Sequence, residues 1–142
     1  MEKTKKKTAV KKAVNGSRSK NKTADAGKIR VAIQGIATSF HEVAAMNFFG
    51  SSAIETVECL SFHSLCESLD KGESNYAVMA IENSVAGSIL PNYFLLQSYH
   101  FSIIGELYLP IHMHLIALPG VKKEDIRCIE SHPMAIRQCA EY

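Results

Sequence analysis

The sequence of 142 residues has no apolar run near the roughly 18 residues that a membrane-spanning helix needs, and no apolar secretory signal at its N-terminus. A cytoplasmic protein without a membrane partner is therefore expected. No two cysteines have the CxxC spacing of redox or zinc motifs. The four cysteines are predicted to be reduced thiols in the core, as is usual in cytosolic proteins: Cys59, Cys66, Cys128 and Cys139.

The sequence also lacks a glycine-rich loop that could cradle phosphate groups. The segment Gly35-Ile36-Ala37-Thr38 has only the first of the three glycines of a dinucleotide-binding motif, so nucleotide cofactors are not expected. His112 and His114 have a spacing that could hold a metal, but no third ligand accompanies them. We predict a packing role for these histidines, no metal site and no cofactor.

Aromatic residues are absent from the first 30 residues, which contain 11 basic and 2 acidic residues, a net charge of +9. The remainder has 5 basic and 12 acidic residues, a net charge of −7. So few apolar side chains cannot offset the entropy of ordering, and residues 1–28 are predicted to be a disordered basic tail. Such a tail could bind a polyanion through salt-sensitive contacts, but a solvated extension is commoner, and no nucleic-acid partner is expected.

The body begins with alternating strand and helix patterns. Strands are predicted over residues 29–34, 53–59 and 76–81, separated by helices that begin at Ser39 and Ser61, both favoured N-cap residues. This order predicts an α/β fold with a parallel sheet and right-handed crossovers.

The rest of the chain has a less regular pattern. We predict a helix over residues 88–99, an extended stretch over 101–119 broken into two or three strands, and a polar turn over 121–125. A short strand over 126–130 is then expected to lead into a helix that starts at residues 131–133.

Two polar signatures directly follow strand patterns, ENSVAGS at residues 82–88 and SHPMAIRQC at residues 131–139. Open α/β sheets bind small ligands at the carboxyl ends of their strands, where helix N-termini offer unpaired N–H groups to anions. A third junction, at Thr38-Ser39, also carries small hydrogen-bonding residues. The three junctions together predict a site for a small anionic metabolite.

The second signature predicts a particular geometry. Residues seven apart lie on nearly the same helix face, so Ser131 and Gln138 would project together over the small side chain of Ala135. Alternatively, Ser131 only caps the helix and Gln138 is a surface residue. In the first signature, Glu82-Asn83-Ser84 could likewise be only a turn with an Asx cap.

In combination these motifs closely resemble the catalytic domain of the prephenate dehydratase family. The resemblance covers residues 29–142 and rests on four segments: Gly35-x-x-Thr38-Ser39-Phe40, Glu82-Asn83-Ser84-x-x-Gly87, Gly105-Glu106 with residues 109–115, and Ser131-His132-Pro133-x-Ala135-x-x-Gln138-Cys139. It implies the decarboxylating dehydration of prephenate to phenylpyruvate in phenylalanine biosynthesis, without a cofactor. It also implies a two-lobed, periplasmic-binding-protein-like (type II) architecture, with a first lobe at residues 29–86 and an incomplete second lobe at 87–142.

The resemblance also implies roles for individual residues. The catalytic positions are Glu82, Asn83, Ser131 and Gln138, and the substrate-binding positions are Thr38, Ser39, Ser84, Gly87 and His132. Prephenate has two carboxylates and a ring hydroxyl, so its site needs anion-binding groups and a proton donor for the departing hydroxyl. Asn83, Ser131 and Gln138 are expected to orient the substrate, and Glu82 to form hydrogen bonds within the cleft.

The sequence departs from the family pattern in two ways. The family usually has glycine in place of Thr38, so the first turn is expected to differ in backbone geometry. The family's catalytic Thr-Arg-Phe motif, the segment that returns to the first lobe and the regulatory ACT domain are absent, so we expect a truncated chain that is inactive as given. A full-length protein would form a dimer or tetramer.

Two alternatives remain open at this point. Arogenate dehydratase uses the same scaffold on a substrate with an amino group in place of the keto group. A module that binds a small carboxylate without turning it over would also fit, since the scaffold is shared with solute-binding proteins.

Overall fold

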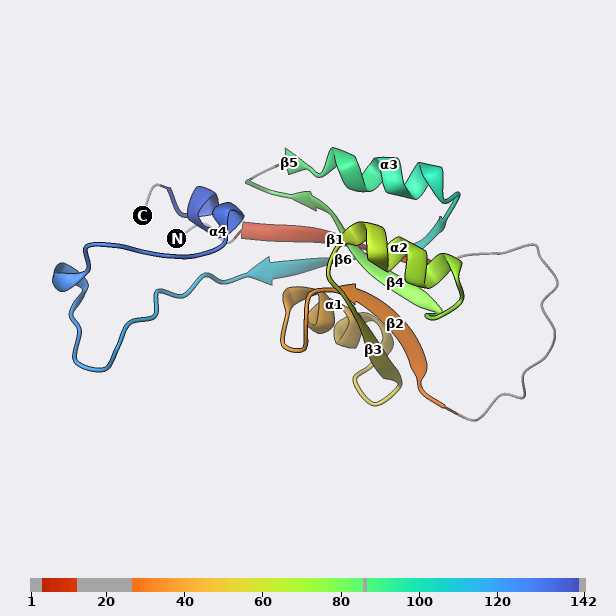
Figure 1. Ribbon diagram of the computed structural model, residues 1–142, viewed down its shortest axis with the longest axis horizontal. Helices are drawn as coiled ribbons and strands as arrows, with labels where there is room; N and C mark the ends of the chain where they lie inside the picture. The colour runs from red at the N-terminus through yellow and green to blue at the C-terminus, as the bar shows by residue number, and fades with distance from the viewer. Residues whose placement is uncertain (1–3, 13–26, 86, 141–142) are drawn as a thin grey trace.

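The computed structural model describes residues 4–12, 27–85 and 87–140. It contains one mixed sheet with the strand order β3-β2-β4-β1-β6, and β5 pairs with β4 outside this path (Figure 1). The strands are β1 (Thr4–Lys12), β2 (Ile29–Gln34), β3 (Ile54–Cys59), β4 (Tyr76–Asn83), β5 (Gly87–Ser88) and β6 (Ser102–Ile111). The helices are α1 (Phe40–Phe49), α2 (Phe62–Asp70), α3 (Leu90–Ser98), the 3-10 helix η1 (Lys123–Asp125) and α4 (Pro133–Gln138).

The predicted α/β class is confirmed, and the three predicted strands pair in parallel. β2 lies between β3 and β4, with Ile33 opposite Glu58 on one side and opposite Val78 on the other. β1 and β5 pair in the antiparallel sense, so the sheet is mixed rather than fully parallel.

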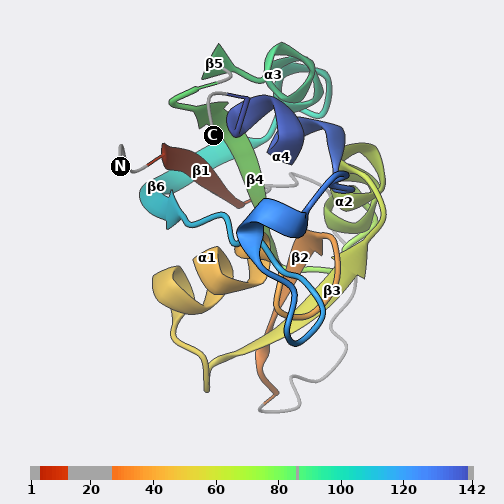
Figure 2. The ribbon, with the colours of Figure 1, turned by 90° about the vertical axis from the view of Figure 1, so that its left-hand side faces the viewer.

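Helices cover both faces of the sheet, and Figure 2 shows α1 and α2 on opposite sides of β2 and β4. Successive strand residues alternate between the two faces, which gives the core two sides. One side combines Ala32, Met79 and Ile81 with buried residues of α2 and α3, among them Leu65, Cys66 and Leu96. The other combines Val31, Ile33 and Val78 with Ala44 and Ala45 of α1 and with Leu109 and Ile111 of β6.

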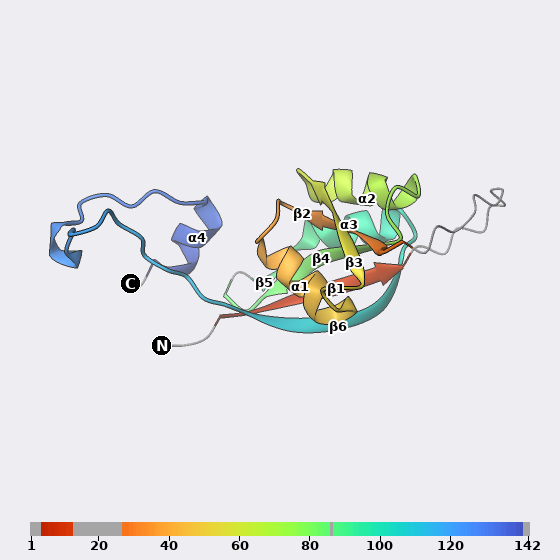
Figure 3. The ribbon, with the colours of Figure 1, turned by 90° about the horizontal axis from the view of Figure 1, so that it is seen from below.

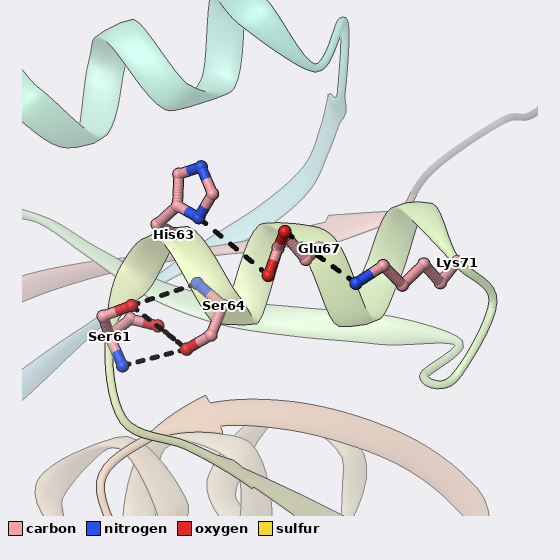
Figure 4. A network of polar contacts seen from close by, with 5 residues as sticks. All are labelled: Ser61, His63, Ser64, Glu67 and Lys71. Carbon is pink, nitrogen blue, oxygen red and sulfur yellow. Dashed lines mark hydrogen bonds and ion pairs between the residues drawn. The ribbon is translucent and has the colours of Figure 1, made fainter.

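Both predicted N-caps are confirmed. Ser39 Oγ accepts from the N–H of Glu42 at 3.3 Å, at the start of α1. At the start of α2, Ser61 and Ser64 form a reciprocal capping box, with backbone-to-side-chain distances of 3.0 and 3.1 Å (Figure 4). These bonds satisfy N–H groups that the first helical turn leaves unpaired.

The outer face of α2 carries two ion pairs, also seen in Figure 4. Glu67 lies 4.0 Å from His63 and 3.8 Å from Lys71, each one helical turn away. All three side chains are largely exposed, and exposed pairs of this kind stabilise a helix only slightly. We therefore regard this network as part of the solvated surface of α2.

The N-terminal tail differs from the prediction over residues 4–12, which form β1 between β4 and β6. Composition gave no sign of this strand, because its pairing satisfies backbone N–H and C=O groups and does not depend on apolar residues. Residues 13–26, which the prediction also covered, lie outside the described residues.

The segment after α3 also differs from the prediction. Residues 102–111 form the single strand β6, which passes through Gly105 and Pro110 without a break. β6 is at the edge of the sheet, where proline is tolerated. The strand predicted over 126–130 is not formed, while the polar turn over 121–125 contains η1.

The predicted lobe boundary after residue 86 falls within this sheet. α3 packs on β4 and α2, and β6 contributes Leu109 and Ile111 to the core beside α1. Residues 112–140 then extend away from the sheet and carry α4 at their end (Figures 1 and 3). The two-lobed architecture stays a prediction.

Two of the four cysteines lie in the sheet and its helices, and two lie in residues 112–140. All four are free thiols, and Cys59 and Cys66 are buried as predicted. Burial, with a smaller contribution from Glu73, raises the pKa of the Cys59 thiol. The prediction was wrong for Cys128 and Cys139, which are exposed, because residues 112–140 bury no apolar side chain.

Candidate functional site

The predicted site residues that precede α3 lie at the carboxyl ends of β2 and β4, two adjacent parallel strands. β2 leads through Gly35–Ser39 into α1, and β4 ends in Glu82 and Asn83. The N–H of Gly35 donates to the carbonyl of Cys59 at 2.9 Å, which holds the first junction beside the end of β3. The carboxyl edge of the sheet therefore gathers the β2–α1 junction and the end of β4, as the sequence predicted.

The β2–α1 junction presents two backbone donors, and the chain's own carboxylates accept from both. The N–H of Ala37 donates to Glu58 Oε1 at 2.7 Å, and the N–H of Thr38 donates to Glu42 Oε2 at 2.5 Å. Thr56 Oγ1 donates to Glu42 Oε1 at 3.4 Å. An anionic ligand at these donors would have to replace Glu42 or Glu58.

Glu58 also belongs to this site and was not predicted from the sequence. It lies one residue before the end of β3, and only the parallel pairing of β2 with β3 brings it to Ala37. The signal that could have revealed it is a charged residue near the carboxyl end of a predicted strand adjacent to the site.

Thr38 has a φ of 68°, in the left-handed region that glycine adopts most easily. The sequence predicted that threonine would change the backbone geometry of this turn, yet the residue takes a positive φ despite its branched Cβ. For a β-branched residue this is a true outlier, and such conformations cost about 1–3 kcal/mol. The hydrogen bond from its N–H to Glu42 helps to hold it there.

Replacing Thr38 with glycine is expected to stabilise the protein by about 1 kcal/mol, because the relieved strain exceeds the added entropy of the unfolded chain. Thermal unfolding monitored by circular dichroism would measure the change. Thr38→Ala should give a smaller gain, since alanine is also disfavoured at positive φ but lacks the branch. A loss of stability in Thr38→Gly would show that the turn does not hold this conformation.

At the end of β4, Asn83 is 5% exposed and its Oδ1 accepts from the N–H of Val85 at 2.9 Å. The side-chain oxygen of Asn83 therefore closes an Asx turn, which confirms the alternative interpretation of this residue. Glu82 is half-buried, whereas Ser84 and Gly87 are exposed. The chain reverses here, so that Asn83 pairs with Gly87 across the β4–β5 ladder.

The second signature begins differently from the prediction. α4 starts at Pro133, and its N-cap is His132, whose Nδ1 accepts from the N–H of Met134 at 3.2 Å. Ser131 precedes the cap and is exposed, while Gln138 is half-buried in the last position of the helix. The helix starts within the predicted range, but Ser131 lies outside it, so the prediction that Ser131 and Gln138 share one helical face was wrong.

Figures 1 and 3 place α4 at the end of the molecule toward which β4 and β6 run. This is the side on which Glu82 and Asn83 lie. The convergence of Asn83, Ser131 and Gln138 on a common pocket stays a prediction.

The described residues were also compared with the requirements of a metal site and of a membrane-spanning helix. In the part of the chain that the structure describes, no three His, Cys, Asp or Glu residues group closely enough to hold a metal ion. His112 and His114 are exposed, so the packing role predicted for them was wrong. Among the same residues, no helix has both the length and the apolar character needed to cross a membrane.

Comparison with known families gives a match over most of the chain. The family model described as prephenate dehydratase matches residues 31–142. This region contains both polar signatures and the β2–α1 junction, and it excludes β1.

Several curated proteins are similar to the chain. Arogenate dehydratase/prephenate dehydratase 1 of Arabidopsis thaliana is 43% identical over 115 residues, which are 81% of this chain and 29% of the relative. Arogenate dehydratase 1 of Petunia hybrida is 39% identical over 111 residues, 78% of this chain and 26% of the relative. The bifunctional chorismate mutase/prephenate dehydratase of Enterobacter agglomerans is 36% identical over 115 residues, 80% of this chain and 30% of the relative.

The chain thus spans less than a third of the length of each of these relatives. No solved structure matches it significantly.

Proposed function

Because the chain belongs to the prephenate dehydratase family, we propose that it supplies part of the site in which prephenate is converted to phenylpyruvate. The observation that carries the proposal is the position of Glu82-Asn83-Ser84 at the carboxyl end of β4, on the same edge of the sheet as the β2–α1 junction. This edge of an α/β sheet is where small anionic ligands bind. The substrate would be a small dianion, and no nucleic acid or membrane partner is proposed.

The reaction sets the requirements for the residues. As carbon dioxide leaves, the electrons of the broken carbon–carbon bond enter the ring, the hydroxyl departs as water after gaining a proton, and the ring becomes aromatic. The protein must therefore hold the carboxylates and place a donor near the hydroxyl. We assign substrate orientation to Asn83, Ser131 and Gln138, and hydrogen bonding within the cleft to Glu82.

The remaining predicted residues would contact the substrate from the two junctions. Thr38 and Ser39 lie at the β2–α1 junction, Ser84 and Gly87 at the β4–β5 turn, and His132 at the start of α4. In this proposal a substrate carboxylate replaces Glu42 or Glu58 as the acceptor for the N–H groups of Ala37 and Thr38.

Arogenate is the second candidate substrate, because several relatives are named arogenate dehydratases. The relatives from Arabidopsis and Petunia are named arogenate dehydratases, the former also prephenate dehydratase, and the bacterial relative is named a prephenate dehydratase. Binding of prephenate and arogenate measured side by side by calorimetry would decide between them. Tighter binding of arogenate would replace prephenate as the proposed substrate.

Asn83→Asp is expected to weaken the binding of prephenate at least tenfold, and also to lower thermal stability, because Asn83 is 5% exposed and a buried carboxylate is costly. Aspartate keeps the oxygen that accepts from the N–H of Val85, but it replaces the amide nitrogen with a charged oxygen that repels a carboxylate. Calorimetric titration would measure the affinity. Asp70→Asn, on the exposed end of α2, provides a matched control with the opposite charge change.

If Asn83→Asp binds prephenate as well as the unmodified chain while remaining folded, Asn83 does not face the substrate. Its role would then be structural, with the Asx turn as one part of it.

We further propose that the chain of 142 residues does not turn over prephenate by itself. Residues 112–140 bury no apolar side chain, so no core of their own fixes Ser131 and Gln138 opposite Asn83. Incubation of the purified chain with prephenate at neutral pH should leave phenylpyruvate at the level of a protein-free control. Formation of phenylpyruvate in proportion to protein concentration would refute this proposal.

Two further proposals concern the protein in its cell. We propose a cytoplasmic location and a homo-oligomer, while the Arabidopsis relative is named chloroplastic. A module that binds a small carboxylate without catalysis remains the non-enzymatic alternative. Substrate binding without product formation in a longer protein that contains this chain would favour that alternative.

A further inference from the structure

Glu58 reaches the β2–α1 junction from the neighbouring strand β3. Its Oε1 accepts from the N–H of Ala37 at 2.7 Å, and among the described residues this is the single hydrogen bond of Glu58. The residue is exposed to solvent. Glu58 therefore covers a backbone donor of the proposed site while being held there by one bond.

The other carboxylate at this junction is held more firmly. Glu42 accepts from the N–H of Thr38 through Oε2, and from Thr56 Oγ1 at 3.4 Å through Oε1. Glu42 is also half-buried, in the first turn of α1. Displacing Glu42 breaks two hydrogen bonds and displacing Glu58 breaks one, so a ligand replaces Glu58 more easily.

A ligand carboxylate that takes this place stays beside a negative charge. The pairing of β3 with β2 holds Glu58 opposite Ile33, so its carboxylate can turn aside but cannot leave the junction. A carboxylate at the N–H of Ala37 is therefore repelled by the carboxylate that it displaced. A positive charge on the ligand, next to its own carboxylate, would turn this repulsion into an attraction.

The two candidate substrates differ at this point of their structure. Both have a carboxylate on the side chain of the ring, and the adjoining carbon carries an ammonium group in arogenate and a keto oxygen in prephenate. With the carboxylate at the N–H of Ala37, the ammonium group can donate a charge-assisted hydrogen bond to the displaced Glu58. The keto oxygen has no proton to donate and carries a partial negative charge, which Glu58 repels.

We propose that Glu58 is a specificity-determining residue of this site, which favours a substrate with an ammonium group next to its carboxylate over one with a keto group. In the free protein Glu58 occupies the N–H of Ala37, and in the complex it accepts from the ammonium group of the ligand. The proposal rests on the proposed function, because it concerns substrates that bind at the β2–α1 junction.

Glu58→Gln tests the proposal, because glutamine keeps an oxygen that can accept from the N–H of Ala37 but has no charge. Calorimetric titrations of each protein with arogenate and with prephenate at neutral pH give the dissociation constants. Arogenate should bind Glu58→Gln about fivefold more weakly, as expected for the loss of an ion pair near the surface. Prephenate should bind about twofold more tightly, since a like charge is removed. The preference for arogenate should thus fall about tenfold.

Glu55→Gln is a matched control, because it removes the same charge from an exposed position near the start of the same strand. It should leave both dissociation constants unchanged. An equal change of preference in Glu55→Gln would show that the overall negative charge of the chain is responsible, and would overturn the proposal. Thermal unfolding of each variant shows that it is folded.

Carbon NMR of the glutamate carboxylates tests the contact in the unmodified chain. Arogenate should shift the side-chain carboxylate of Glu58 together with the amide of Ala37, while the carboxylate of Glu55 stays unchanged. If both substrates bind but Glu58→Gln leaves their ratio unchanged, or arogenate does not shift the carboxylate of Glu58, the proposal is wrong and the proposed function stands. If neither substrate binds the unmodified chain, the proposed function fails and this proposal fails with it.

Discussion

Replacing Gly105 with alanine is expected to destabilise the protein by about 1 kcal/mol, because the added methyl group would collide with an aromatic ring. A Cβ at this position in β6 would lie 2.7 Å from both Cε2 and Cζ of Phe48. Non-bonded carbon atoms essentially never come this close, so the ring of Phe48 would have to shift from its place beside Phe49. This contact explains why an edge strand carries a glycine at a position where α1 crosses it.

The same substitution should have the opposite effect once the ring is removed. In the Phe48→Ala background, Gly105→Ala is expected to stabilise the protein by about 0.5–1 kcal/mol, because alanine loses less backbone entropy than glycine in a strand. Urea unfolding of the four proteins of this cycle measures both values. Ser102→Ala, at an exposed position of β6, serves as a control and should change stability little.

A destabilising Gly105→Ala in both backgrounds would contradict this account. The glycine would then be required for the backbone of β6 and not for the packing of α1.

Replacing Asn92 with alanine is expected to cost about 2–3 kcal/mol, the largest effect of a single side chain that we predict. Asn92 is 2% exposed, and its Nδ2 donates to the carbonyl of Ala80 at 2.6 Å. Ala80 lies within β4, so this bond joins α3 directly to the sheet. Without it, a buried carbonyl is left without its hydrogen bond.

Gln97→Ala is a matched control, because this residue is exposed on the same helix. It should change stability by less than about 0.5 kcal/mol. If Asn92→Ala costs no more than the control, the carbonyl of Ala80 must be satisfied in another way, and α3 is not fixed to β4 by this bond.

The parts of the fold that were predicted correctly are those with local signals. Ser39 and Ser61 mark the starts of α1 and α2 because a cap acts within one helical turn. β4 was predictable from its continuous apolar run, which reflects burial on both faces.

The parts that were missed depend on contacts between distant segments. β1 has no apolar pattern and exists through its ladders to β4 and β6. Glu58 reaches the β2–α1 junction only through the pairing of β3 with β2. Neither of these long-range pairings is visible in a local window of sequence.

In the candidate site, too, some features were predicted correctly from the sequence and others were missed. The sequence placed Asn83 correctly at the end of a buried strand, where its oxygen closes an Asx turn. It predicted a helix start at residues 131–133 correctly but did not identify His132 as the N-cap, since histidine is not a usual N-cap residue.

The proposal as a whole requires prephenate to bind at the carboxyl edge of β2 and β4. A titration of the isotopically labelled chain with prephenate, followed by amide NMR, tests this most directly. We expect the largest shifts at the amides of Ala37, Thr38, Asn83 and Ser84, with none in the outer face of α2 around Glu67. Saturating shifts confined to other regions, or none at millimolar prephenate, would contradict the assignment of this edge as the substrate site.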